Sequence, residues 1–129
     1  MINPFQIGDK KTIQKIVKNK DTATFETGEV HPVYATFALG RDAEWACRQF
    51  VLDMKESNEE GIGTFLNIQH HSPALLGSEI DIIATLDKVE KNKVICSYEV
   101  KCKGRLIASG TTGQAILDKT KIEKLFTTL

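Results

Sequence analysis

The stretch from Val33 to Met54 constrains the fold most, because it is the only long segment with the periodicity of a helix. At about 100° per residue, its small and apolar side chains fall on one stripe. This stripe consists of Leu39, Ala43, Ala46, Cys47, Phe50 and Met54. Gly40 lies in the same part of the helix, where glycine costs about 1 kcal/mol relative to alanine. We therefore expect another backbone to approach the helix closely there.

The segments after this helix alternate between apolar and polar residues, as strands do. We expect strands over Ile62–His70, Ser78–Val89, Val94–Cys102 and Leu106–Leu117, and a weaker strand before the helix over Gly8–Val17. Residues 18–32 are polar and indicate irregular structure, and the lysine-bearing tail indicates a short helical end. Consecutive strands after a single helix predict an antiparallel α+β sheet with one covered face.

The composition is that of an ordinary globular protein and excludes several classes of function. A chain of 129 residues is expected to form one domain, residues 1–129. Seventeen basic residues balance seventeen acidic ones, which gives no general attraction to nucleic acid or to an anionic membrane. No apolar run reaches membrane-spanning length, and no signal peptide opens the chain.

The three cysteines indicate buried thiols rather than a disulfide framework or a metal site. Cys96 and Cys102 are six residues apart in one expected strand, which separates them by about 20 Å. No spacing of cysteine and histidine suggests zinc, so we expect no metal. Free thiols on apolar faces are typical of a reducing compartment, and we expect a cytoplasmic protein.

Three polar residues are candidates for chemistry. Glu44 lies at the border of the apolar stripe, where its carboxylate would point into a cleft between helix and sheet. Thr36, eight residues earlier, lies at the start of the helix on the same side. His70 ends the first strand after the helix.

The sequence around these residues resembles a known family. The stretch A-T-F-A-L-G-R-D-A-E-W-A-C contains Thr36 and Glu44, and the later stretch G-x-G-T-F-L-N-I-Q-H-H-S-P-A-L-L-G contains Gly63 and His70. Both resemble the fluoroacetyl-CoA thioesterase-like family over about residues 33–116. The resemblance implies a hot-dog fold, in which an antiparallel sheet wraps one long helix. It also implies a catalytic triad of Thr36, Glu44 and His70, and a substrate contact at Gly63.

Two positions differ from the family pattern. An arginine near the substrate is replaced by Gln114, in the stretch G-T-T-G-Q-A, and an aromatic residue that covers the pocket is replaced by Val30. We expect Gln114 and Val30 to contact the substrate in a pocket that is closed less tightly over a very small acyl group. The expected result is weak or no preference for fluoroacetyl over acetyl.

Each residue of the implied triad also has a structural alternative. Thr36 could cap the helix, since threonine is a preferred N-cap residue. Glu44 could form a surface ion pair with Arg48, four residues later in the favoured order. His70 could be hydrogen-bonded in the turn formed by residues 71–73.

Together, these features predict an acyl-CoA thioesterase that acts on a small or medium acyl group. Glu44 is the candidate base or nucleophile, His70 would orient a group or move a proton, and Thr36 would hydrogen-bond the carboxylate or the substrate. The backbone N–H of Gly63 would hold the oxyanion. No cofactor is implied beyond the coenzyme A of the substrate. The alternative is a non-catalytic acyl-CoA-binding hot-dog module; a hot-dog regulator is disfavoured because no DNA-binding segment is present.

The open edges of a single sheet predict association with a second copy. Ile62–His70 is the expected edge strand, because it follows the helix directly and carries few charges. We expect a homodimer or a dimer of dimers with active sites at the subunit interface. Trp45 and Leu52, on the other side of the helix from its apolar stripe, could be covered by a neighbouring subunit or by the amino-terminal segment. Weak candidates for contacts to the phosphates of coenzyme A are Lys101, Lys103 and Arg105.

Overall fold

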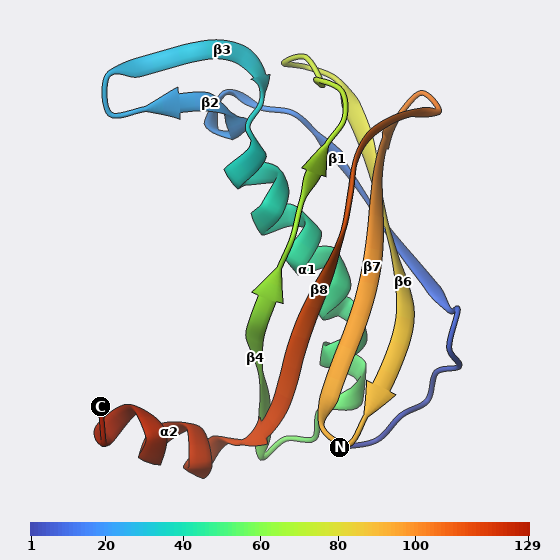
Figure 1. The fold of residues 1–129 in the computed structure, drawn as a ribbon, viewed down its shortest axis with the longest axis vertical. Helices are drawn as coiled ribbons and strands as arrows, with labels where there is room; N and C mark the ends of the chain where they lie inside the picture. Colours follow the sequence, from blue (N-terminus) through green and yellow to red (C-terminus); the bar gives the residue numbers. More distant parts are fainter.

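One antiparallel sheet curls around one long helix in the computed structural model, which describes residues 1–129 (Figure 1). The helix is α1 (Thr36–Met54). The sheet has the strand order β1-β6-β7-β8-β4, and the short β5 pairs with β8. Its strands are β1 (Lys10–Ile16), β4 (Glu59–Leu66), β5 (Gln69–His70), β6 (Glu79–Glu90), β7 (Lys93–Cys102) and β8 (Arg105–Asp118). This is the α+β hot-dog architecture that the sequence predicts.

The apolar stripe of α1 forms the centre of the core, as predicted. All six stripe residues are completely buried: Leu39, Ala43, Ala46, Cys47, Phe50 and Met54. The helix begins at Thr36 rather than at Val33, because Val33 and Tyr34 complete the preceding strand. A Cβ atom on Gly40 would lie 2.9 Å from the Ile68 side chain. Side chains therefore approach the helix at Gly40, and the expectation of a close backbone was wrong.

The central strands confirm the predicted alternation. The inward side chains of β6 and β7 are all buried, namely Ile80, Ile82, Ala84, Leu86, Val94, Cys96, Tyr98, Val100 and Cys102. Tight turns join β6 to β7 and β7 to β8, and Lys91 and Lys103 adopt positive φ angles of 56° and 50° there. All three cysteines are free and buried. No helix is long and apolar enough to cross a membrane.

The predicted strand Ile62–His70 is divided in two. β4 begins earlier, at Glu59, and ends at Leu66, before β5 resumes at Gln69. The Asn67 side chain explains the break, because its oxygen accepts from the Thr111 N–H at 2.9 Å and its amide donates to the Thr111 hydroxyl. A side chain thus occupies the position of a strand partner. β4 lies at an edge of the sheet, as predicted.

Residues 18–32, expected to be irregular, contain ordered elements. The short helix η1 (Asn19–Asp21) leads into a hairpin of β2 (Thr22–Phe25) and β3 (Gly28–Tyr34). Nearly every residue of β3 is exposed, so no alternation of apolar residues marks it as a strand. The hairpin projects past the β4 edge at one end of the molecule, and α2 (Lys119–Thr127) projects on the same side at the other end (Figure 1). The helical tail was predicted.

A network of charges around the buried carboxylates of Asp21 and Asp42 joins the hairpin to the helix and to β1. The Lys15 ammonium lies 3.0 Å from Asp21 and 2.8 Å from Asp42, and Arg41 contacts the same two carboxylates. Tyr34 of β3 donates a hydrogen bond to Asp42. Burial alone would raise the pKa of Asp21, but the hydrogen bonds that it accepts hold this pKa below its ordinary value. The network fixes the hairpin over the first turn of α1.

Candidate active site

The first turn of α1 places Thr36 beside His70. The N-cap residue is Ala35, and no side chain caps the helix. The Thr36 hydroxyl lies 2.9 Å from Nδ1 of His70 instead, so the capping alternative for Thr36 is wrong. His70 is fixed by β5, where it pairs with Ala108 of β8. Strand and helix therefore bring together two residues of the implied triad.

The His70 imidazole is poised to take or give a proton. Its Nε2 atom is buried and has no hydrogen-bond partner. Burial lowers the pKa of His70 below its ordinary value of 6.5, and the nearby charge of His71 lowers it further, whereas a backbone hydrogen bond with Ser72 acts in the opposite direction. The ring is thus neutral at pH 7. A cavity of about 250 Å³ lies against His70, His71, Ser72 and Pro73.

Glu44 lies on the same helix and faces β4. A Cβ atom on Gly63 would lie only 2.6 Å from Oε1 of Glu44, so the carboxylate fills the space that a side chain would need. The two residues line a cavity of about 240 Å³. Glu44 makes no ion pair, because Arg48 binds Glu60 at 3.0 Å. The surface pair of Glu44 with Arg48 is therefore wrong, and Glu44 faces the cleft between helix and sheet.

Arg48 has a structural role in this region that its position in the sequence does not indicate. Its Nη1 atom donates to the Gly61 carbonyl at 3.1 Å and to the side-chain oxygen of Gln114 at 3.4 Å. Gln114 is buried on β8, opposite Gly63 in the strand register. Arg48 thereby fixes β4 against the helix next to Glu44. The spacing of four residues from Glu44 suggested that Arg48 forms an ion pair, and it does, but with Glu60.

The predicted residues form two clusters within one chain. Thr36 and His70 form the first, and Glu44 and Gly63, with Gln114 nearby, form the second. Eight residues of helix separate Thr36 from Glu44, which corresponds to about 12 Å along the axis. One chain therefore does not assemble the complete triad.

The predicted substrate contact Val30 lies in the β2–β3 hairpin. It belongs to β3 and is 54% exposed. Two exposed aromatic residues lie in this region, Phe25 and Phe37, and their rings pack edge to face with centroids 5.7 Å apart. Both are more than half exposed, and Phe37 directly follows Thr36. The sequence does not indicate this aromatic pair, because nothing in residues 18–32 predicts the hairpin that brings Phe25 to Phe37.

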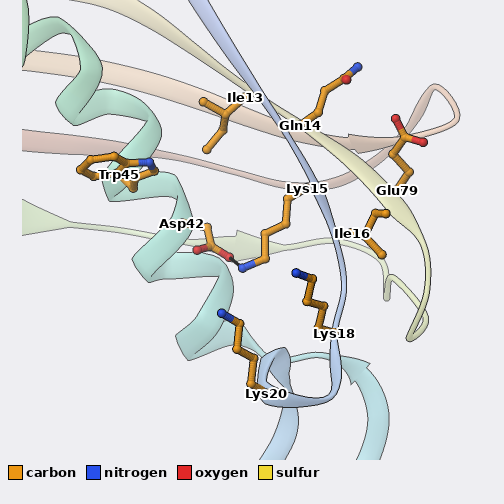
Figure 2. Close-up of a pocket in the computed structure, with 9 residues that line it drawn as sticks. All are labelled: Ile13, Gln14, Lys15, Ile16, Lys18, Lys20, Asp42, Trp45 and Glu79. Atoms are coloured by element: carbon orange, nitrogen blue, oxygen red, sulfur yellow. Dashed lines mark ion pairs between the residues drawn. The ribbon is translucent and has the colours of Figure 1, made fainter.

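A further groove of the molecule contains none of the predicted site residues. It has a volume of about 650 Å³ and lies between β1 and α1, at the opposite edge of the sheet from β4 (Figure 2). No group of three or more His, Cys, Asp or Glu side chains is arranged to hold a metal ion.

The sequence matches the fluoroacetyl-CoA-specific thioesterase family over residues 17–120. The chain belongs to this family. A thioesterase-superfamily protein from Thermus thermophilus is 37% identical, with a TM-score of 0.92 over 98% of this chain and 93% of that chain. No curated protein matches the sequence.

Structures of more distant similarity share the fold. The fluoroacetyl-CoA thioesterase FlK is 22% identical, with a TM-score of 0.87 over 96% of both chains. A hot-dog-like protein from Thermanaerovibrio acidaminovorans is 20% identical, with a TM-score of 0.86 over 95% of this chain and 90% of that chain. A variant of FlK has been solved in complex with fluoroacetate and CoA. Membership of the fluoroacetyl-CoA-specific thioesterase family supports a thioesterase activity.

Proposed function

We propose that the protein is an acyl-CoA thioesterase that hydrolyses a small or medium acyl group with Thr36, Glu44 and His70. The unpaired carboxylate of Glu44, held against Gly63 in a member of a thioesterase family, carries the proposal. A carboxylate without a cation partner is free to act on a substrate as base or nucleophile.

The chemistry requires few groups. Water, activated by Glu44, or Glu44 itself adds to the thioester carbonyl, and negative charge develops on the carbonyl oxygen. The Gly63 N–H is the proposed donor to that oxygen. The C–S bond then breaks, and coenzyme A leaves as a thiolate, which is a good leaving group because free thiols have a pKa of about 8.5. Where Glu44 is the nucleophile, water then hydrolyses the acyl–Glu44 anhydride, which releases the carboxylic acid and restores the Glu44 carboxylate. The neutral His70, hydrogen-bonded to Thr36, is suited to transfer the proton that the attacking water loses to the leaving thiolate.

We further propose that the protein functions as a homodimer formed through β4. β4 pairs only with β8, so its other edge is open. Its last two residues, Phe65 and Leu66, are 45% and 38% exposed. The β2–β3 hairpin and α2 project past this edge and would pack against the second copy (Figure 1). Open edges and exposed apolar surface are typical of an interface between identical subunits.

A dimer of this kind would complete the triad. Gly40 lies halfway between Thr36 and Glu44 on the helix, and it packs beside Leu66 at the end of β4. A two-fold axis near Leu66 would place the helix turn that carries Glu44 in one subunit opposite the turn that carries Thr36 in the other. Glu44 would then face Thr36 and His70 of the partner subunit, and the acyl-CoA would enter between subunits.

Arg105 is the best placed of the three basic residues considered for the phosphates of coenzyme A. Its guanidinium donates to the Pro73 carbonyl at 2.8 Å and contacts the Ser72 hydroxyl. It therefore lies beside the cavity that His70 shares with these residues. Arginine binds phosphate through two parallel hydrogen bonds, which favours Arg105 over Lys101 and Lys103.

The pH dependence of the reaction should reflect the environment of His70. Since its pKa lies below the ordinary value of 6.5, the neutral ring persists as the pH falls past 6.5. We expect the acid limb of kcat/KM that His70 causes to have its midpoint below pH 6.5. His31→Gln, a change on the exposed β3, should leave the limb in place. A midpoint above pH 7 would contradict the assigned role.

The Gly63→Ala variant should separate activity from stability. The new methyl group would displace the Glu44 carboxylate, which is the movable end of a side chain. A displacement of about 1 Å at a reacting group costs on the order of 10²-fold in rate. We expect a loss of that size in kcat/KM with a nearly unchanged melting temperature. Because both changes act through the same carboxylate, the double variant with Glu44→Gln should be no less active than Glu44→Gln alone, and unchanged activity in Gly63→Ala would refute the proposed site.

Substrate preference should differ from that of a fluoroacetyl-specific enzyme. Val30 supplies no aromatic cover, and the Gln114 amide is held by Arg48. We expect kcat/KM for fluoroacetyl-CoA to exceed that for acetyl-CoA by less than about tenfold, which is the lower end of the about 1–3 kcal/mol that one small substituent is worth. Longer and aryl acyl-CoAs complete the panel. A preference of a thousandfold or more would show this inference to be wrong.

The second candidate function is an acyl-CoA-binding module without catalysis. The same two positions favour it, because Val30 and Gln114 both differ from the family pattern. Calorimetric titration with acyl-CoAs, run beside the thiol-release assay, distinguishes the two functions. Tight binding without turnover over the whole panel would favour the module, and thiol release that depends on Glu44 would exclude it.

A further inference from the structure

The groove between β1 and α1 has the properties of a second binding site. Its volume of about 650 Å³ is within the range of pockets for small ligands. It lies on the far side of the helix from Glu44, because β1 and β4 form opposite edges of the sheet. The proposed thioesterase reaction uses none of the residues that line it.

One end of the groove is cationic. The ammonium groups of Lys15, Lys18 and Lys20 turn toward the same space beside Asp42 (Figure 2). Lys15 is bound by two carboxylates, whereas Lys18 and Lys20 are exposed and form no ion pair. These two lysines therefore leave an uncompensated positive charge at this end.

The carboxylates nearby do not cancel this charge. Asp21 and Asp42 are each paired with both Lys15 and Arg41, so the four groups together are neutral. Glu79 lines the groove at its far rim, away from the lysine ammonium groups (Figure 2). An entering anion would therefore meet Lys18 and Lys20.

The other end of the groove presents a flat aromatic surface. Trp45 is 50% exposed, and its indole lies one helical turn beyond Asp42, with Ile13 of β1 nearby (Figure 2). The groove thus has a cationic end and an aromatic end, as the phosphate and the base of a nucleotide require. Stacking on an exposed indole favours planar heteroaromatic rings.

We propose that this groove binds a nucleoside phosphate, with the phosphate on Lys18 and Lys20 and the base stacked on Trp45. Two ammonium groups match the double charge of a phosphate monoester, which lysine binds as a point charge. Free nucleotides and the adenosine phosphate portion of coenzyme A both have this chemistry. The proposal does not depend on the thioesterase reaction, and either one stands if the other fails.

Trp45 makes the test direct, because it is the only tryptophan of the chain. Its intrinsic fluorescence is titrated at low salt with AMP, adenosine, inorganic phosphate and coenzyme A. We expect AMP to quench the emission and to bind about tenfold or more tightly than adenosine or phosphate, because only AMP uses both ends of the groove. Quenching by coenzyme A with the same dependence on the lysines would identify the coenzyme as a source; quenching by AMP alone would identify free nucleotides.

Matched variants complete the test. Lys18→Ala combined with Lys20→Ala should weaken AMP binding about tenfold or more, since each charged contact contributes substantially. Both lysines are exposed, so the variant should fold normally. Lys91→Ala with Lys93→Ala removes the same charge from the distant β6–β7 turn and should have no effect. Equal quenching by adenosine and AMP, or binding insensitive to the Lys18/Lys20 change, would overturn the proposal.

Discussion

Replacing Glu44 by glutamine should reduce thiol release from acyl-CoAs by about 10³-fold or more, because the amide can neither accept a proton nor attack a carbonyl. Glutamine has nearly the same shape as glutamate, so packing against Gly63 should be retained. Glu44 makes no ion pair that the change would break. The loss should therefore appear in kcat with an unchanged melting temperature, measured by a continuous assay for free thiol.

The matched control is Glu99→Gln, which removes one carboxylate from an exposed position of β7. It should retain full activity. A Glu44→Gln protein with the activity of the unmodified chain would refute the proposed mechanism, although the hot-dog fold would stand. Tight binding of acyl-CoA by the inactive variant would show that Glu44 acts in the chemical step.

Two inactive variants should restore activity to each other if each active site is shared between subunits. Glu44→Gln and His70→Ala should each be inactive alone. In a mixed dimer, one of the two sites would combine the intact Glu44 of one chain with the intact His70 of the other. Random exchange makes half of the dimers mixed, so about a quarter of the normal activity should return.

The mixing experiment requires subunit exchange, which brief incubation in mild denaturant and refolding provides. Light scattering should give twice the chain mass for each variant and for the mixture. The double variant, mixed with an excess of either single variant, should stay inactive. Dimers that exchange subunits without any return of activity would place all three residues in one subunit, and a fully active monomer would exclude the dimer itself.

The elements that depend on local periodicity could be predicted from the sequence. The stripe of α1 repeats with the helical period, and inside and outside residues alternate over all of β7 and over β6 as far as Leu86. Their boundaries shifted by only a few residues. The hairpin of β2 and β3 gave no such signal, because it projects from the sheet and buries almost none of its side chains.

The candidate site could be predicted as a set of residues but not as an arrangement. From its position in the sequence, the Thr36 hydroxyl could bond to the helix amides as a cap or to another side chain of the site. The return of the chain through β5 settles its partner, because β5 brings His70 to the Thr36 hydroxyl. Arg48 could reach Glu44 or Glu60, and the second pairing depends on where β4 lies. Hydrogen-bond and ion-pair partners that are far apart in the chain depend on the register of the strands. The spacing of residues along one helix carries no information about that register.

The position of β1 at the far edge of the sheet has a consequence for how the chain folds. β6, β7 and β8 are joined by tight turns and pair with their neighbours in sequence, so they can form early. β1 is synthesised first, yet it pairs only with β6, Lys10 meeting Thr85 and Ile16 meeting Glu79. Closing that long loop costs entropy, and we expect β1 to dock late and to detach early on unfolding. The residues that form one wall of the groove beside Trp45 are therefore among the last to reach their places, and a ligand bound there would slow their release.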